Sequence, residues 1–415
     1  MSIPLLAPFA ASLTTEKAFD VLVVARRLKA TGKDVIELQI GDSPFPTTRH
    51  AVEAGKQAID AGRTTYGPSA GLPEFREAAA HFVRTEFGVP ATIENIVAGP
   101  GAKPFQTFFC EAFLETGDAV LVFEPAFPTF VPNILRRGAV PVFAPLRAAN
   151  AFRPDLDAIE RFVKSHPRAK AIVLNSPHNP TGGVATKSDL AAIADLVRGT
   201  SIAVFCDEPY CHMAWAAPHL SLLAEPGMME QCVGAYTFSK SYSMSGWRLG
   251  FAVARPDVAA AMSKMINTSL SCVPPFVQIA GAAALQHDGA ERDATMAKFR
   301  AKVELLVEAL REVNDVAVAM PAGTFYVFPD VSAICHRLKI TSHGLAMYLL
   351  EGADDSRGVA CLGGECFGEA GRGFLRFSCA EPDERLREAV RFLADAVTRT
   401  DRIAAYLSAN PWARG

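Results

Sequence analysis

Four polar segments of this 415-residue chain carry the side chains best suited to chemistry. They read AGPGAKP at 98–104, NSPHNPTGG at 175–183, DEPY at 207–210 and SKSYSMSGWRLG at 239–250. The last three each follow a short apolar run, and ligands of open α/β sheets bind at the carboxyl ends of the strands. One polar cluster at a strand end is ordinary in a loop, but four in this order indicate a shared ligand.

These segments offer an amine from Lys240, a carboxylate from Asp207 and a guanidinium from Arg248. We expect the three groups to converge from separate strand ends around one aromatic aldehyde. The ligand that suits such a set is pyridoxal 5′-phosphate (PLP). No segment has metal-ligand spacing, so we expect no metal site.

The elements that must position these groups are short strands alternating with helices. Apolar, β-branched runs at 119–123, 171–174, 202–206 and 233–238 predict buried strands, and KSDLAAIADLVR at 187–198 has helical spacing. This alternation predicts an α/β fold with a mostly parallel central sheet between helices.

The length favours two domains. The C-terminal third has a hairpin-like TFYVFPD, a strand-like GFLRFSCA and a final amphipathic helix from near Pro382, which predict a smaller α+β domain. We expect a large PLP-binding domain at 46–312 and a discontinuous small domain from 1–45 and 313–415. The first residues, broken by Pro4 and Pro8, favour an extended arm over a signal peptide.

The composition excludes several classes of function. Hydrophobic residues make up 50% and charged residues 20% of the chain, as in globular proteins, and the formal net charge is −3. This charge gives no basis for binding nucleic acid or an anionic membrane, and no apolar run is long enough to span a bilayer. The nine scattered cysteines favour reduced thiols, so we expect a cytoplasmic protein.

Over nearly its whole length the chain resembles the class I/II aminotransferases, which are PLP enzymes of fold type I. The resemblance rests on NxPxNPTG, on CDEPY, on SK followed by GWRxG, and on RFS near the end. Each motif is weak alone, but together and in this order they are specific. The resemblance implies ping-pong transfer of an amino group from an L-amino acid to a 2-oxo acid such as 2-oxoglutarate.

The resemblance also implies which residues hold PLP. Lys240 would form the Schiff base and shuttle a proton, and Asp207 would pair with the pyridinium nitrogen. Tyr210 and Asn179 would hydrogen-bond the phenolic oxygen O3′. The phosphate would be held by Gly101, Ala102, Lys103, Ser239 and Arg248.

Two aromatic residues complete the implied cofactor site. Phe127 matches the residue that stacks on the pyridine ring, although a core phenylalanine is equally compatible with its spacing. Tyr66 resembles a tyrosine that reaches the phosphate of a neighbouring subunit, which implies a homodimer.

For the substrate, the resemblance implies that Arg376 grips the α-carboxylate through two hydrogen bonds and that Gly41 lies over it. A plain turn glycine is the alternative for Gly41. Lys103 matches a lysine that, in one subgroup of aspartate aminotransferases, contacts the distal carboxylate of dicarboxylic substrates. A lysine that points into solvent is the alternative, so aspartate, glutamate and aromatic amino acids all remain candidate donors.

Departures from the motifs leave some questions open. His178 stands where the family has Pro or Asn, and we expect it to be an exposed turn histidine. Gly363 replaces a proline in CLGGECFG, which borders the expected substrate entrance. A C–S β-lyase on the same fold would share every cofactor residue and is the alternative function. A PLP-binding regulator would need a basic DNA-binding domain, which the sequence does not predict.

Overall fold

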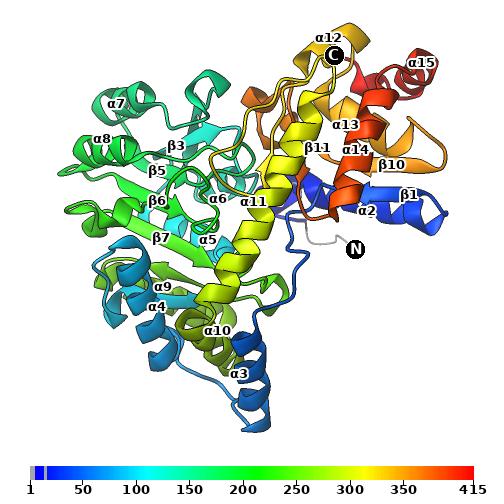
Figure 1. Ribbon diagram of the computed structural model, residues 1–415. Coiled ribbons are helices and arrows are strands. Elements are labelled where there is room, and N and C mark those ends of the chain that lie inside the picture. The colour runs from blue at the N-terminus through cyan, green and yellow to red at the C-terminus, as the bar shows by residue number, and fades with distance from the viewer. Residues whose placement is uncertain (1–4, 14–15) are drawn as a thin grey trace.

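A seven-stranded sheet forms the centre of the computed structural model, which describes residues 5–13 and 16–415 (Figure 1). Its strand order is β2-β8-β7-β6-β5-β3-β4, and β8 alone runs in the opposite direction to the other strands. The strands are β2 (Ile96–Gly99), β3 (Ala119–Glu124), β4 (Val140–Pro145), β5 (Ala169–Asn175), β6 (Ala203–Asp207), β7 (Cys232–Thr237) and β8 (Gly250–Val253). The prediction of a mostly parallel sheet is confirmed.

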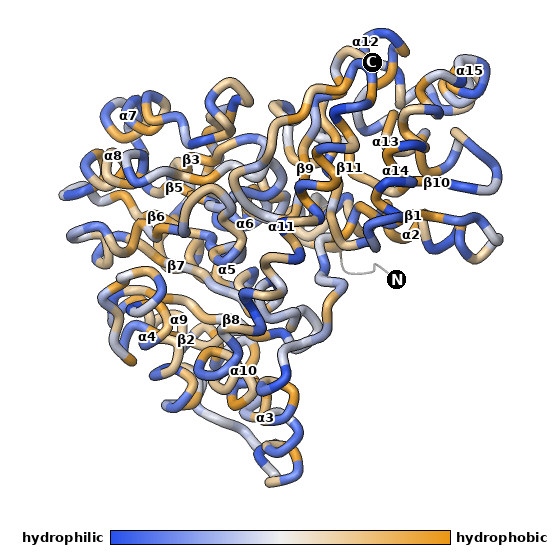
Figure 2. The backbone as a smooth tube through the Cα atoms, in the orientation of Figure 1, coloured by the Kyte–Doolittle hydropathy of each residue, from blue (hydrophilic) through white to orange (hydrophobic). Residues whose placement is uncertain are grey.

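Helices cover both faces of this sheet. Side chains of β3 alternate between two hydrophobic clusters, with Leu121 in one and Val120 and Val122 in the other, as a strand period of two requires. The first face packs on α4 (Pro73–Phe87), α7 (Leu156–Ser165), α8 (Lys187–Val197) and α10 (Pro275–His287), and α10 also packs on α3 (Arg49–Asp60). The second packs on α5 (Lys103–Phe113), α6 (Phe130–Arg136) and α9 (Pro256–Leu270). Figure 2 shows the apolar strands inside and hydrophilic helix surfaces outside.

A second hydrophobic core joins the N-terminal and C-terminal segments. Strand β1 (Asp34–Glu37) pairs in parallel with β10 (Arg357–Ala360), and β11 (Leu362–Gly363), β12 (Leu375–Ser378) and β9 (Tyr326–Val327) form an antiparallel sheet. The helices here are α2 (Lys17–Ala30), α12 (Ser332–Leu338), α13 (Ser342–Glu351), α14 (Asp383–Ala396) and α15 (Thr400–Ala409). The long helix α11 (Gly289–Arg311) runs from beside α10 into this core (Figure 1).

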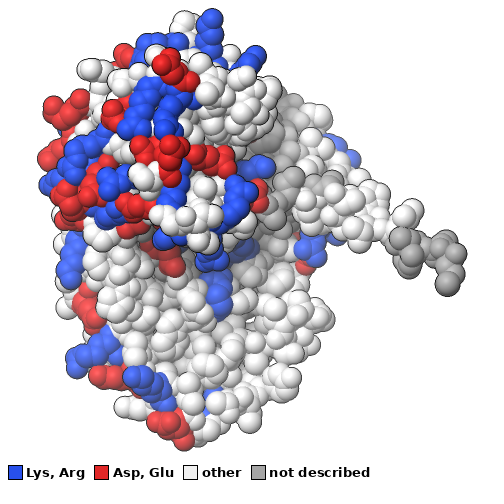
Figure 3. Space-filling view, turned by 90° about the vertical axis from the view of Figure 1, so that its right-hand side faces the viewer, with Lys and Arg blue, Asp and Glu red and all other residues white. Residues whose placement is uncertain are grey.

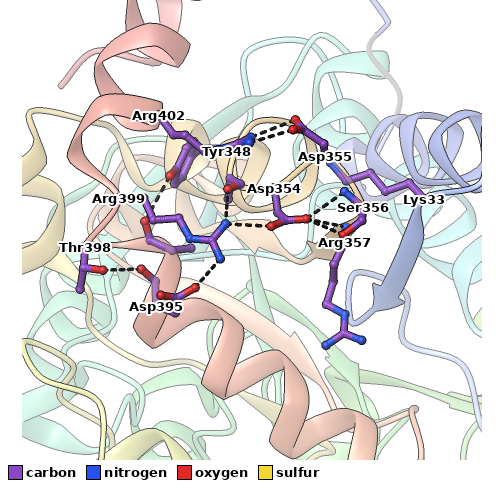
Figure 4. A network of polar contacts seen from close by, with 12 residues as sticks. Lys33, Tyr348, Asp354, Asp355, Ser356, Arg357, Asp395, Thr398, Arg399 and Arg402 are labelled. Carbon is purple, nitrogen blue, oxygen red and sulfur yellow. Dashed lines mark hydrogen bonds and ion pairs between the residues drawn. The ribbon is translucent and has the colours of Figure 1, made fainter.

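Ion pairs connect the beginning of α15 to the loop before β10 (Figure 4). Asp354 accepts hydrogen bonds from Ser356 and from Arg399, which lies just before α15. Arg402 donates to Asp355 through its two terminal guanidinium nitrogens, Nη1 and Nη2. The bonds from Ser356 and then Arg399 hold the pKa of Asp354 well below its usual range. Basic and acidic side chains lie interspersed on this side of the molecule (Figure 3).

Two sequence predictions about the ends of the chain are wrong. The N-terminal segment is not simply extended, because Pro8 begins a short helix, α1 (Pro8–Ser12), as proline favours a first helical position. TFYVFPD forms no hairpin; its strand β9 pairs with the distant β12. The helix predicted from near Pro382 is confirmed as α14, which begins directly after this residue, and a second helix, α15, follows it. Within the described part of the chain, no helix combines the length and hydropathy needed to cross a membrane.

Candidate active site

A cavity of about 320 Å³ lies at the carboxyl ends of β5, β6 and β7, beside β9 and β12. Parallel neighbours β5, β6 and β7 end at the same edge of the sheet, so their following loops meet there. The residues that line it are Glu16, Ala18, Phe19, Ile40, Gly41, Ala102, Lys103, Gln106, Phe127, Asn175, Asn179, Asp207, Pro209, Tyr210, Thr237, Ser239, Lys240, Ser245, Arg248, Tyr326 and Arg376.

Lys240 follows β7 and points into this cavity. Its Nζ donates a hydrogen bond of 2.5 Å to the carbonyl oxygen of Gly41. The same nitrogen lies 6.0 Å from the ring centroid of Tyr210 and 5.7 Å from that of Phe325. The amine is therefore held over aromatic faces in a half-buried position rather than on the open surface.

Asp207, the last residue of β6, carries the carboxylate at the base of the cavity. The residue is 4% exposed, and within residues 5–13 and 16–415 no hydrogen bond to its carboxylate is found. Burial, and next the charge of Glu208, raise the pKa of Asp207 to about 7. The charge of Lys103 acts in the opposite direction but does not cancel this rise. A buried carboxylate without a hydrogen-bond partner is costly, so the position favours a ligand that brings a cationic donor.

The opposite end of the cavity has the parts of an anion site. Gly101 has φ +88°, and a Cβ there would lie 2.7 Å from Nη2 of Arg248. The guanidinium of Arg248 is aimed by hydrogen bonds to the carbonyl oxygens of Ser245 (2.8 Å) and Pro100 (3.0 Å). Helix α5 begins beside it at Lys103, and the first N–H groups of a helix lack partners within the helix.

Arg376 on β12 faces the same cavity from the other side. The residue is 4% exposed, and its Nη1 lies 3.1 Å from Oδ1 of Asn179 and its Nη2 2.5 Å from the carbonyl oxygen of Gln39. Its buried Nε has no hydrogen-bond partner among the described residues. Such an arginine has donor capacity left for an anion. Gly41 cannot be replaced by a larger residue without displacing a neighbour, because a Cβ there would lie 1.8 Å from the hydroxyl of Tyr326.

Lys103 and Phe127 form the outer wall of the cavity. Nζ of Lys103 lies 5.4 Å from the ring centroid of Phe127 and forms an ion pair with the carboxylate of Glu16, just before α2. The Lys103 side chain is 46% exposed and that of Glu16 is 18% exposed. The carboxylate of Glu16 thus occupies the position at Lys103 where the carboxylate of a ligand could bind.

Tyr66 lies elsewhere in the single chain, Gly101 lies beside the lining residue Arg248 without lining the cavity itself, and His178 differs from its prediction. Tyr66 is 88% exposed and outside the cavity. His178 is 4% exposed and bonds Thr181 Oγ1 through Nδ1 at 2.8 Å, so the prediction of an exposed turn histidine is wrong. Burial lowers the pKa of His178 to about 3, because it disfavours the charged imidazole.

The cavity is also lined by four polar residues that the sequence did not predict, namely Glu16, Gln106, Thr237 and Tyr326. Tyr326 stands in a strand of only two residues, which gave no pattern from which the direction of its side chain could be assigned.

The donor set fits PLP. Asp207 could receive a protonated ring nitrogen, Tyr210 and Asn179 could supply donors to a phenolic oxygen, and Lys240 could reach an aldehyde, because all four line the same cavity. The cradle at Gly101, which a Cβ would fill, suits a phosphate.

Comparison with known proteins agrees with this reading. The family model described as aminotransferase class I and II matches residues 33–393. The chain belongs to this family. As a member of it, the protein is a PLP-dependent aminotransferase of fold type I.

Relatives of this aminotransferase carry several substrate names. Aspartate aminotransferase of Pyrococcus horikoshii is 34% identical over 88% of this chain and 91% of the relative. Aromatic-amino-acid aminotransferase 2 of Thermococcus litoralis is 31% identical over 86% of this chain and 90% of its own. The structure of aspartate aminotransferase from Thermus thermophilus with maleate superimposes with a TM-score of 0.88, at 30% identity, and covers 95% of this chain and 100% of that one.

Proposed function

We propose that this aminotransferase transfers the amino group of an L-amino acid to a dicarboxylic 2-oxo acid such as 2-oxoglutarate, with Lys240 as the lysine that binds PLP covalently. The observation that carries the proposal is the convergence of Lys240, Asp207, Arg248 and Arg376 on one cavity. An amine, a buried carboxylate and two guanidinium groups leave room for one ligand of matching chemistry between them.

In this proposal each residue has one task. When bound, PLP supplies an electron sink for the charge that develops at Cα. Lys240, once free, removes the proton from Cα and delivers it to C4′ of the cofactor. Asp207 keeps the ring nitrogen protonated, and Tyr210 donates a hydrogen bond to O3′. Arg376 orients the α-carboxylate so that Cα faces Lys240.

The proposal extends to the rest of the phosphate and ring contacts. Gly101, Ala102, Lys103, Ser239 and Arg248 would surround the phosphate. The hydroxyl of Ser239 is held by Thr237 Oγ1 at 2.9 Å, which supports a fixed donor there. Phe127 would stack on the ring, and Asn179 would contact both O3′ and the substrate. Gly41 would lie over the α-carboxylate.

The pair of Glu16 and Lys103 supports two modes of substrate binding. When the substrate has a neutral side chain, such as an aromatic one, the ion pair between Glu16 and Lys103 can remain formed. A dicarboxylate can displace Glu16 and take Lys103 for its distal carboxylate. We therefore propose aromatic and acidic amino acids as donors. Lys103→Ala should raise KM for aspartate or glutamate far more than for an aromatic amino acid; equal effects on both would remove the basis for dicarboxylate recognition.

We further propose a cytoplasmic homodimer with sites shared between subunits. Tyr66 is exposed in the single chain, as are the apolar side chains of Leu5, Leu6 and Leu270, which supports burial against a second copy. All nine cysteines are free thiols, which supports a reducing compartment. Sedimentation would give the mass in solution, and Tyr66→Phe should weaken PLP binding without changing that mass.

The division into domains at 46–312 and at 1–45 with 313–415 is part of the same proposal. The two separate hydrophobic clusters around Phe251 and Tyr348 support it. Helix α11 crosses the division, since Met296 to Leu310 contribute to the second core.

A panel of amino donors with 2-oxoglutarate, assayed as the PLP-loaded protein, tests the function. We expect glutamate to form in proportion to the 2-oxo acid of the donor, and Lys240→Ala to abolish this. Release of ammonia and pyruvate from a cysteine conjugate, without amino transfer, would instead assign the lyase. Normal turnover by Lys240→Ala would end the assignment of Lys240.

A further inference from the structure

Tyr326, the first residue of β9, touches both halves of the active site. The residue is 2% exposed, and its hydroxyl lies 3.1 Å from the hydroxyl of Tyr210. The guanidinium carbon of Arg376 lies 4.4 Å from the centroid of its ring. One buried side chain therefore contacts the expected donor to the cofactor and the expected anchor of the substrate.

The hydroxyl of Tyr326 is not needed for packing. A phenylalanine would keep the ring contacts with Arg376 and with Phe325, whose centroid is 4.6 Å away. A buried hydroxyl without a partner is costly, and within the described chain its only hydrogen-bond partner is Tyr210. Gly41 leaves room for the whole end of this side chain, since a Cβ there would lie 1.8 Å from the hydroxyl oxygen and 2.7 Å from Cζ of the ring.

The number of protons decides the direction of the bond between the two tyrosines. Each hydroxyl has one proton to donate. If Tyr210 gives its proton to the cofactor oxygen O3′, the proton between the tyrosines must come from Tyr326. Chains of hydrogen bonds polarise one another, so a Tyr210 that accepts a hydrogen bond is a stronger donor.

We propose that Tyr326 is a positioning residue that donates to Tyr210, strengthens the hydrogen bond from Tyr210 to O3′, and holds the guanidinium of Arg376 over its ring. This inference rests on the proposed role of Tyr210 in binding PLP. The charged groups around the two hydroxyls come from three other elements: Asp207 ends β6, Lys240 follows β7 and Arg376 lies on β12. Burial, and next the neighbouring Tyr326, raise the pKa of Tyr210 above its usual range, so it stays a protonated donor.

The hydroxyl is tested by Tyr326→Phe in the PLP-loaded protein, with the absorbance of the lysine–cofactor imine titrated against pH. A donor to O3′ stabilises the negative oxygen most when the imine nitrogen is unprotonated, so a weaker donor raises the imine pKa. We expect a rise of about 0.2 to 0.7 unit for Tyr326→Phe and a larger rise for Tyr210→Phe. The double variant should match Tyr210→Phe alone, because the effect passes through Tyr210.

A Tyr326→Phe titration identical to that of the wild type would overturn the relay. So would a rise of the same size in the Tyr210→Phe background. The imine absorbance of the wild type is a separate result: its absence would refute the proposed function, whereas its presence with an unshifted Tyr326→Phe refutes only the role of Tyr326.

The ring is tested through the affinity for maleate, a dicarboxylate that cannot donate an amino group. Tyr326→Leu removes the nearer of two aromatic rings beside Arg376; the other, Phe367, has its centroid 5.1 Å from the guanidinium carbon. This variant should weaken maleate binding about tenfold, whereas Tyr326→Phe should stay within about twofold of the wild type. Calorimetry measures both constants without turnover. Equal weakening by the two variants, or none by Tyr326→Leu, would show that the ring does not hold Arg376.

Discussion

The buried carboxylate of Asp207 should make the cofactor-free protein less stable than it would be with a neutral residue at this position. Burial and the charge of Glu208 raise its pKa from the usual 3.8 to about 7. Between about pH 4 and pH 7 the folded state holds a proton that the unfolded state has released, so the free energy of unfolding falls as pH rises through this window. The loss is complete above about pH 7.

The size of the effect follows from the shift. A change of about 3 pH units at about 1.4 kcal/mol each corresponds to about 4 kcal/mol above pH 7. Asp207→Asn keeps the shape of the side chain and cannot ionise. We therefore expect the cofactor-free variant to exceed the wild type by about 4 kcal/mol at about pH 8 and to match it near pH 4.

Urea unfolding of both proteins without PLP, at one protein concentration and several pH values, measures this difference. Asp288 provides a matched control. Burial acts to raise its pKa as well, but hydrogen bonds, among them those from His50 and from the backbone N–H of Ala51, outweigh burial, so that its pKa is lowered overall. Asp288→Asn should therefore destabilise the protein at pH 8. A gain for Asp207→Asn that does not depend on pH, or no gain, would refute the reasoning. With PLP bound the wild type should be the more stable protein, since the carboxylate of Asp207 then has the ring nitrogen as its partner.

Three further predictions concern residues around the cofactor cavity. Arg376→Lys loses the two-pronged contact with the α-carboxylate and should lower kcat/KM about thirtyfold for all donors, measured by steady-state kinetics; a loss confined to one donor would contradict this. Gly101→Ala combines a strained φ with a clash against Arg248 and should raise the Kd for PLP at least about tenfold, measured by absorbance titration. Glu16→Gln weakens the pair with Lys103 and should lower KM for 2-oxoglutarate up to about fivefold while sparing aromatic donors; an equal change for both would argue against displacement of Glu16.

The sequence predicted the parts of the site that depend on local patterns. The strands before Asp207 and Lys240 are apolar runs followed directly by polar residues, and parallel neighbours place such ends together whatever the rest of the chain does. Helix α4 begins at Pro73 and ends before Gly88, whose φ of +70° suits glycine, because these signals act within one turn.

The missed residues depend on contacts between distant parts of the chain. Tyr326 meets Tyr210 across 116 positions, and Glu16 meets Lys103 across 87. A two-residue strand such as β9 gives no periodicity from which its facing side chains could be assigned.

His178 was misjudged for a similar reason. Its turn is rich in proline and glycine, which usually marks a surface loop. Here a distant segment covers the turn: the N–H of Gly323 donates to the carbonyl oxygen of Gly182 at 2.9 Å, and Pro321 packs against Gly182. Burial of the loop therefore came from tertiary packing that the local sequence does not encode.

The central claim is that Lys240 is the lysine that binds PLP, and borohydride reduction tests it most directly. The reagent fixes any lysine–cofactor imine, and mass spectrometry of the digested protein then locates the added mass. We predict that the pyridoxyl group is found on the peptide that contains Lys240 and on no other. Its presence on Lys103, the other lysine of the cavity, or its absence from every lysine of a protein that holds PLP, would contradict the account.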